Sequence, residues 1–501
     1  MAGMRGCSVP TSASEHDANT NDIEESSYMK MRNEATRACD RCHAIKERCQ
    51  WTKASRDCAR CCRLGFECQS LRPLKKAGRP PRAALPRKMA SARRETDNVN
   101  KAAIVESLDM GHLLSALYPS VTRSLSQFND LSFEDQRLIQ QVIFDDDAMN
   151  TFVLGPSFWE MHRGLLISHF VVSRHTLKDA FLAMGKCWNK LTDRPSEQKV
   201  QSDAYNRHAS SALARLQQFQ VHDSHGVSEC LILAGMIVSY AYCSSVSDVS
   251  TVCNQALGLI KPSYESGSNL GSDDLVFLTC MIVPELVHCL LHGSVPTLRF
   301  RPILESRPSV DRYMGLSTPL LPYFYDLCEL GNALAHADDN DIHQVLEALD
   351  PIESAVLSWQ PQIPDKFCSD FTTIEVAHIL CQVQVMRLAA LLIIHRLRFP
   401  FGCNDKPAET MAACILTQLE VTYLTTKKPV VAVGLPVLVA YLNIQDSAER
   451  DRWYSRIPDM VGYTPPFAAY YQCLISSFWT ARDVLESIPW YNIGSVLSPL
   501  V

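Results

Sequence analysis

Six cysteines near the start of the chain are the residues whose types and spacing best suit metal chemistry. In each half of the set, two residues separate the first two cysteines and six residues separate the second from the third, and eight residues separate the halves. Zinc prefers four thiolate ligands in a tetrahedron. Six thiolates give two zinc ions four ligands each only if two sulfurs are shared, so the duplicated pattern predicts a two-zinc cluster. The six are Cys39, Cys42, Cys49, Cys58, Cys61 and Cys68.

A one-zinc arrangement is the rival interpretation of the same segment. The two C-x2-C pairs, fifteen residues apart, also fit a single-zinc ribbon. That ribbon leaves Cys49 and Cys68 unused, although each stands seven positions after the second cysteine of its pair. The two-zinc cluster uses both. Cys62, directly after Cys61, is then surplus, and we expect it to be a free thiol.

The rest of the sequence favours metal binding over disulfide formation. The first twenty residues contain no apolar stretch of the kind found in secretion signals. The longest apolar runs, near 231–242 and 388–394, are too short or too interrupted to span a bilayer. We therefore expect no membrane segment and a reducing compartment, where close-set cysteines more often bind metal. Scattered cysteines such as Cys230 and Cys280 lie in apolar stretches and are expected to be core residues.

A short basic segment stands on an otherwise acidic chain. Residues 37–94 contain 17 Lys and Arg against 4 Asp and Glu, whereas the rest of the chain contains 31 against 50. This asymmetry favours a polyanionic partner for the basic segment alone. Charge by itself leaves a solvated basic linker open as the alternative.

The cysteine segment resembles the zinc module of a known family. The run Ala38-Cys39-Asp40-Arg41-Cys42 and the later Leu64-Gly65-Phe66-Glu67-Cys68 are similar to the fungal binuclear zinc-cluster (Zn(II)2Cys6) transcription factors. That resemblance implies a DNA-binding domain in which a short helix after the second cysteine presents a lysine to a CGG-type triplet in the major groove. It also implies that Cys39 and Cys58 are the bridging ligands of two Zn²⁺ ions.

The resemblance assigns further roles residue by residue. Lys46 takes the base-reading position and could donate to guanine O6 and N7, and Arg48 matches the basic position before the third cysteine. Family members usually carry basic residues where this chain has His43 and Ile45, and the loop 50–57 lacks the usual proline. The remaining cations are expected to contact phosphates. The full set of candidate DNA-contacting residues is Lys46, Arg48, Arg41, His43, Lys53 and Arg79.

The basic linker carries a second, weaker likeness. The run 75–82 resembles the core of a minor-groove AT-hook, in which an Arg-Pro segment enters a narrow A·T tract, although Ala77 stands where an arginine is usual. The same cations are typical of a nuclear import signal. We therefore expect the protein in the nucleus, and Arg79 remains the candidate for groove insertion.

The sequence divides into four parts, and its fold class is mainly α. We expect a disordered tail over 1–36, a zinc-cluster DNA-binding domain over 37–70, a basic Pro-containing linker over 71–100 and an all-helical domain over 101–501. Capping boxes are expected at Ser132 and Thr176, and Pro262 among other prolines is expected to break a helix. The predicted helices cover residues 133–145, 177–192, 200–218, 227–243, 273–291, 320–336, 341–358, 372–397, 408–426 and 467–487.

The sequence of the helical part contains no familiar catalytic or nucleotide-binding motif. It contains none of the H-E-x-x-H, Walker, G-x-S-x-G or G-x-G-x-x-G motifs, so we expect no enzyme. It is similar to the helical regulatory region of fungal regulators, which implies activation, repression or response to an effector. We expect control of RNA polymerase II genes, contact with the transcription machinery or co-regulators, and possible homodimerisation. Some family members control secondary-metabolite gene clusters, and no residue here selects a pathway. The alternatives are an enzyme or an interaction adaptor whose zinc module is purely structural.

Overall fold

The computed structural model describes residues 38–44, 49–50, 58–64, 68–69, 131–192, 202–244, 249–267, 270–301, 309–338 and 340–497. The chain divides into two compact units, Met1–Val99 and Asn100–Val501. Both units are helical, and no extended strand occurs in the described part of the chain, where β-type pairing is confined to isolated bridges such as Asp311–Gly315. The prediction of a small cysteine module followed by a large all-helical domain is confirmed.

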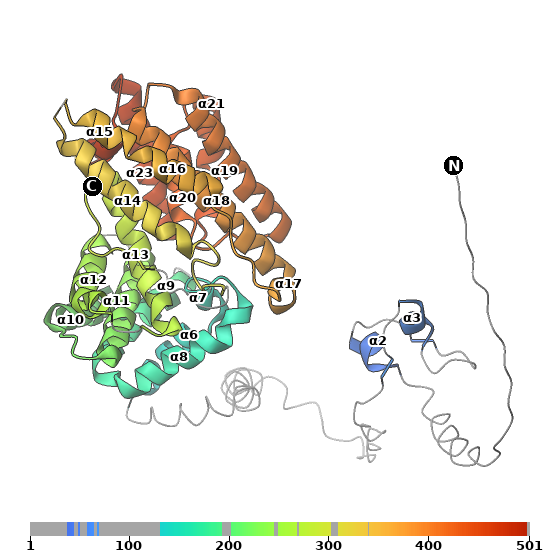
Figure 1. Cartoon of the computed structure of the whole chain (residues 1–501). Helices are drawn as coiled ribbons and strands as arrows, with labels where there is room; N and C mark the ends of the chain where they lie inside the picture. The colour runs from blue at the N-terminus through green and yellow to red at the C-terminus, as the bar shows by residue number, and fades with distance from the viewer. Residues whose placement is uncertain are drawn as a thin grey trace, which may run out of the picture. The chain divides into compact units, whose positions relative to one another are not determined.

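The second unit begins with a group of helices that runs from cyan to green in Figure 1. In this group α11 packs against α9, α12 and α13, so that α11 is central. The helices are α6 (Phe133–Phe144), α7 (Asp146–Met149), α8 (Trp159–Val172), α9 (Arg174–Thr192), α10 (Ser202–Gln218), α11 (Ser224–Ser244), α12 (Val249–Glu265) and α13 (Ser272–His292), with a 3-10 turn η2 at Pro156–Phe158.

A second group of helices, yellow to red in Figure 1, is built around α18, which contacts α14, α16, α19 and α20. Contacts of α11 with α23 and of α13 with α14 and α24 join the two groups, and one continuous apolar core runs through both. The helices are α14 (Leu321–His336), α15 (Ile342–Glu347), α16 (Leu349–Ser358), α17 (Phe367–Asp370), α18 (Thr373–Arg398), α19 (Asp405–Thr426), α20 (Gly434–Leu442), α21 (Ser447–Tyr454), α22 (Ile457–Val461), α23 (Pro465–Val484) and α24 (Ile493–Leu497), with 3-10 turns η4 (Thr318–Leu320) and η5 (Trp490–Asn492).

Local sequence signals gave mixed results for helix ends. Ser132 caps α6 as predicted, since its Oγ accepts a hydrogen bond from the amide of Asp135 at 3.1 Å. The prediction for Thr176 is wrong because α9 begins at Arg174, directly after the turn at Ser173. The prediction for Pro262 is also wrong. It lies in the last turn of α12, where a missing amide hydrogen costs one intrahelical bond without ending the helix.

Three helices are long and apolar enough to cross a membrane by length and composition: Ser224–Ser244, Asp274–His292 and Thr373–Arg398. The sequence-based expectation of no such segment is therefore wrong on length, because isolated polar residues interrupt the apolar runs without ending the helices. In the body these helices form the interior, with between 61% and 72% of their most apolar windows buried. One of their polar side chains is hydrogen-bonded to the following loop, since Glu285 Oε1 accepts from the Thr297 amide at 3.1 Å.

A buried carboxylate ties the start of α18 to the first group. Glu375 closes a capping box with Thr372, accepting from its amide at 2.8 Å and its hydroxyl at 2.7 Å. The same carboxylate accepts from the amide and hydroxyl of Ser157, each at 2.8 Å. Although burial opposes it, these hydrogen bonds hold the pKa of Glu375 below its usual value. The capping box thus joins segments more than two hundred residues apart.

A buried histidine makes the body sensitive to acid. His162 stacks between the rings of Phe152 and Phe277, at 5.9 and 5.5 Å between centroids, and neither ring nitrogen has a hydrogen-bond partner among the described residues. Burial, together with the nearby Arg312 charge, lowers the pKa of His162 to about 3. Below the unfolded-state pKa of 6.5, His162 binds a proton in the unfolded chain but stays neutral in the native state.

We therefore expect stability to fall as the pH drops through this window. Between pH 6.5 and pH 5 the His162 contribution should lower the free energy of unfolding by about 1–2 kcal/mol. Urea denaturation of the wild type and of His162→Leu across this range measures the effect. The variant should show a shallower loss of stability, and parallel curves would contradict the assignment.

Candidate metal centre

Each half of the cysteine module begins with the same local structure. Helices α2 (Asp40–Ala44) and α3 (Ala59–Arg63) each start directly after a cysteine, and that cysteine caps the helix. The Cys39 sulfur accepts from the amide of Cys42, and the Cys58 sulfur accepts from the amide of Cys61, both at 3.4 Å. The C-x2-C spacing places the second thiol one turn later, so both thiols of a pair face the same side.

The third cysteine of each half returns to the first. The amide of Cys39 donates to the Cys49 sulfur, and the amide of Cys58 donates to the Cys68 sulfur, both at 3.4 Å. Backbone hydrogen bonds also cross between the two halves. The amide of Asp40 in the first half donates to the Gln69 carbonyl in the second at 2.9 Å. The equivalent bond from Ala59 N to the Gln50 carbonyl is 2.8 Å long. The sequence repeat is therefore a structural repeat with matched contacts.

The six thiols gather into two overlapping groups of four. One group contains Cys39, Cys58, Cys61 and Cys68, and the other contains Cys39, Cys42, Cys49 and Cys58. Within each group the sulfurs lie within 4.8 Å of one another, and Cys39 and Cys58 belong to both groups. These groups could hold metal ions.

The sulfur separations suit a tetrahedral site. The Cys39 and Cys58 sulfurs lie 3.8 Å apart, the Cys39 and Cys61 sulfurs 3.8 Å, and the Cys42 and Cys58 sulfurs 3.7 Å. A tetrahedron with Zn–S bonds of about 2.3 Å has an S–S edge of about 3.8 Å. These three separations match that edge, and the remaining separations within each group lie within 4.8 Å.

The two shared thiols have the most anionic character. Although burial opposes it, hydrogen bonds from the Cys61 amide and neighbouring thiols lower the pKa of Cys58 to about 6. The pKa of Cys39 is lowered in the same way, mainly by its bond from the Cys42 amide, again against burial. Burial raises the pKa of the Cys49 thiol to about 12 and that of Cys68 to about 11. Thiolates are the metal-binding form of cysteine. The backbone amides therefore favour the metal-binding form at the two shared positions more than at Cys49 and Cys68.

Other predicted residues are placed less fully. Cys62 is exposed on α3 and belongs to neither thiol group, and His43 is exposed on α2. Arg41 lies in α2 between the paired cysteines. The other candidate DNA-contacting residues lie outside the described residues: Lys46, Arg48, Lys53 and Arg79.

Sequence reasoning missed the amide-to-sulfur hydrogen bonds and the two backbone hydrogen bonds between the halves. Spacing alone gives no direction for an amide hydrogen, so the four bonds at 3.4 Å were not predictable from it. One signal was available, because Gln50 and Gln69 each follow the last cysteine of a half. Their carbonyls accept the two backbone hydrogen bonds that cross between the halves, so the repeat extends one residue beyond the cysteines.

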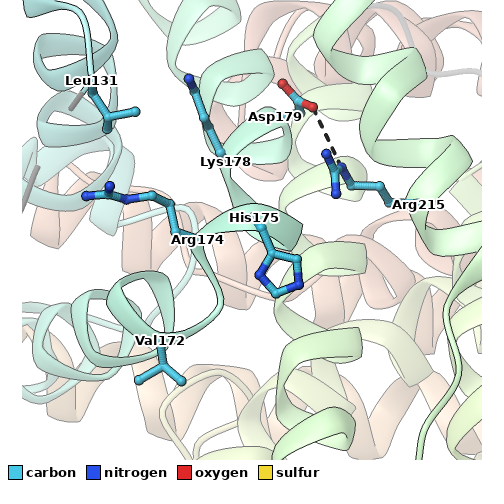
Figure 2. A pocket seen from close by; sticks show the side chains of 7 residues that line it. All are labelled: Leu131, Val172, Arg174, His175, Lys178, Asp179 and Arg215. Carbon is cyan, nitrogen blue, oxygen red and sulfur yellow. Dashed lines mark ion pairs between the residues drawn. The ribbon is translucent and has the colours of Figure 1, made fainter.

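The helical body contains a basic surface pocket with different chemistry. It encloses about 440 Å³, and Figure 2 shows Arg174, His175 and Lys178 from α9 along its wall. Arg215 of α10 forms an ion pair with Asp179, at 3.8 Å between Nε and Oδ2. The pocket is lined mainly by cationic side chains, and its lining residues include neither serine nor cysteine.

Comparison with known proteins gives one finding for the helical body. The model of a family described as fungal specific transcription factor domain matches residues 144–495. That span begins in α6 and ends in α24, so it covers nearly all of the described helical body. No curated protein matches the chain. No solved structure matches it either.

Proposed function

The chain belongs to the fungal specific transcription factor domain family, and on that premise we propose that it is a sequence-specific DNA-binding regulator of genes transcribed by RNA polymerase II. The observation that carries the proposal is the pair of thiol groups sharing Cys39 and Cys58, placed ahead of a transcription factor domain. The family description is that of a regulator, which favours this function over catalysis.

Two Zn²⁺ ions are the proposed cofactors of the module. The six thiols form two sets of four with two members in common, and this is the donor count that two tetrahedral ions need. The thiolate set is soft and suits zinc over harder cations such as Mg²⁺. The ions would hold α2 and α3 in a fixed relation, because no large apolar core is available to a segment of this size.

DNA is the proposed partner of residues 37–70. A short helix beside a metal cluster can place a side chain in the major groove, and Lys46 is the second residue after the end of α2 in the sequence. The basic linker over 71–100, including Arg79, adds phosphate or minor-groove contacts and a nuclear import signal. The helical domain then contacts co-regulators or a second copy, and the protein acts in the nucleus.

The proposal is tested by DNA binding of the full-length protein at physiological salt. We expect specific binding to CGG-containing duplexes, and Lys46→Ala should weaken it by about tenfold or more, since a base contact contributes roughly 1–3 kcal/mol. Arg48→Ala should weaken specific and scrambled duplexes about equally, because a phosphate contact reads no base. Lys406→Ala, an exposed lysine of the helical body, serves as the matched control and should change neither.

Equal affinity of the zinc-loaded protein for CGG-containing and scrambled duplexes would overturn the proposal. Such a result would favour an interaction adaptor with a structural zinc module, which binds protein partners with no preference among DNA sequences. A salt dependence of binding without sequence preference has the same meaning, because counterion release is insensitive to sequence.

A further inference from the structure

The basic surface pocket of the helical body collects cations from two helices. Arg174, His175 and Lys178 come from the first two turns of α9, and Arg215 reaches the same pocket from α10 (Figure 2). The chain outside residues 37–94 is acidic, with 31 Lys and Arg against 50 Asp and Glu. A gathering of cations on the surface of an acidic body favours an anionic partner.

Two of these cations are held only loosely by the chain itself. Lys178 Nζ lies 3.5 Å from Asp135 Oδ2. Arg215 Nε lies 3.8 Å from Asp179 Oδ2. Both distances exceed the range of about 2.7–3.2 Å for an N–H···O hydrogen bond, and neither cation has a closer partner within the described part of the chain. The N–H donors of both side chains therefore remain available to another acceptor.

The carboxylate that lines the pocket belongs to Asp179, and its oxygens are already engaged. Oδ1 lies 2.8 Å from His208 Nδ1, and Oδ2 accepts from the Ser211 hydroxyl at 2.6 Å. Elsewhere in the body an arginine pairs much more closely, since Arg398 lies 2.6 Å from Asp350. The loose pairing at the pocket is therefore a local feature, and Asp179 alone does not neutralise the cations around it.

The start of α9 is an unfavourable place for cations unless an anion is nearby. A helix N-terminus carries about half a positive charge, so Arg174 and Lys178 add charge of the same sign to it. The first turn of α9 contains no acidic residue, whereas that of α6 contains Glu134 and Asp135. An anion in the pocket would offset this repulsion in addition to pairing with the side chains of both helices.

Apolar side chains border the same pocket. Leu131 and Val172 line it, and Val172 is exposed, as is Phe133 two residues after Leu131. The pocket encloses about 440 Å³, which is the share of roughly fifteen water molecules at about 30 Å³ each. This space is larger than one anionic group needs, and exposed apolar side chains suit a ligand that carries apolar groups beside its charges.

We propose that this pocket docks a short segment of a partner protein in which carboxylates alternate with bulky apolar side chains. The carboxylates pair with Arg174, Lys178 and Arg215, and the apolar side chains cover Val172 and Leu131. A nucleic acid backbone would offer phosphates but no apolar group for Val172, and an inorganic anion would fill only part of the space. The partner is a co-regulator, and on this point alone the inference rests on the proposed function.

Fluorescence anisotropy of a labelled peptide of alternating glutamate and leucine tests the docking on the full-length protein. We expect saturable binding that weakens as salt is added, because salt screens charges near the surface. Lys178→Gln and Arg215→Gln should each weaken binding about fivefold, which corresponds to about 1 kcal/mol. Val172→Asp should weaken it at least as much, since it removes an apolar contact and adds a charge of the same sign as the peptide.

Two matched variants separate docking from a general effect of charge. Arg299→Gln removes an arginine whose side chain is 46% exposed, against 43% for Arg215. Val484→Asp changes a valine at the end of α23 that is 80% exposed, against 68% for Val172 at the end of α8. Both control variants should bind the peptide as the wild type does. All the substituted side chains are at least partly exposed, so the unfolding midpoints should stay close to that of the wild type.

Equal affinity of the wild type and the pocket variants would overturn the proposal and assign the peptide to the basic segment over 37–94, which these substitutions leave unchanged. Equal binding of a glutamine–leucine peptide would overturn it as well, because the carboxylates would then have no role. Displacement of the peptide by millimolar inorganic phosphate at constant ionic strength would identify a simple anion site instead.

DNA binding of the same variants separates this inference from the proposed function. Affinity for CGG-containing and scrambled duplexes should be the same in Lys178→Gln, Arg215→Gln and the wild type. Weaker binding of both duplexes by the two variants would mark the pocket as a nucleic-acid surface and contradict peptide docking. Loss of peptide binding with intact recognition of CGG would refute the docking alone, and peptide binding without recognition of CGG would refute the proposed function alone.

Discussion

Replacing Cys39 or Cys58 with serine is expected to release both zinc ions, whereas Cys49→Ser should leave at least one bound. Each shared cysteine belongs to both thiol groups, so its loss leaves each ion with three thiolates. The group of Cys39, Cys58, Cys61 and Cys68 is untouched by the Cys49 change. Structural zinc contributes on the order of 10 kcal/mol to the folding of small modules, so we expect specific DNA binding to fall by at least about 100-fold when both ions are lost.

Zinc content by elemental analysis and DNA affinity are measured on the same preparations of full-length protein. Cys62→Ser is the matched control, because this thiol is adjacent to Cys61, is exposed and belongs to neither group. It should keep wild-type zinc content and affinity. If Cys39→Ser and Cys49→Ser lose the same amount of zinc, the sharing of Cys39 is contradicted.

The second large effect is expected in the helical body, at a buried charge cluster. Asp405, at the start of α19, pairs with Arg396 at 2.6 Å and with Arg482 at 3.5 Å. The Arg396 side chain is 0% exposed, and its Nε donates to the Asn443 amide oxygen at 2.6 Å. Both guanidinium groups lie over the ring of Phe401, at 4.5 and 5.2 Å. The Arg482 side chain is 8% exposed, and burial lowers its pKa to about 10.

Asp405→Asn is expected to lower the free energy of unfolding of the body by about 3–5 kcal/mol, because it leaves two buried cations without their shared anion. Asp350→Asn is the matched control. Asp350 also pairs with an arginine, Arg398, at 2.6 Å, but its side chain is 73% exposed. An exposed pair contributes at most about 1 kcal/mol. Urea denaturation compares the two variants, and similar losses of stability would contradict the role of burial.

The sequence predicted the helical character of the body better than its detailed boundaries. The Ser132 cap was predictable because a cap is a local hydrogen bond over three residues. Thr176 carries the same local pattern, but the carboxylate of Asp179 is drawn to His208 and Ser211 of α10, at 2.8 and 2.6 Å. Such tertiary partners leave no trace in a short window of sequence, and they decide which of two similar patterns becomes a helix start.

The thiol groups were predictable for a different reason. Tetrahedral coordination restricts the number of ligands, so the repeated spacing of six cysteines favours a shared arrangement over a one-zinc ribbon with little knowledge of the fold. The packing of aromatic residues between α11 and the segment that leads into α23 had no such signal. Tyr242 and Tyr463 come from segments far apart in the chain, and each alone is an ordinary aromatic residue beside apolar neighbours. Their convergence depends on how the two helix groups pack, which local patterns do not determine.

The number of zinc ions bound per chain tests the account most directly. Elemental analysis of the purified full-length protein, dialysed to remove loosely bound metal, should find two zinc ions per chain. Both should be released when the thiols are blocked with a mercurial reagent. A value of one zinc per chain in a sample that binds CGG-containing DNA specifically would contradict the shared cluster, and with it the proposed origin of DNA recognition.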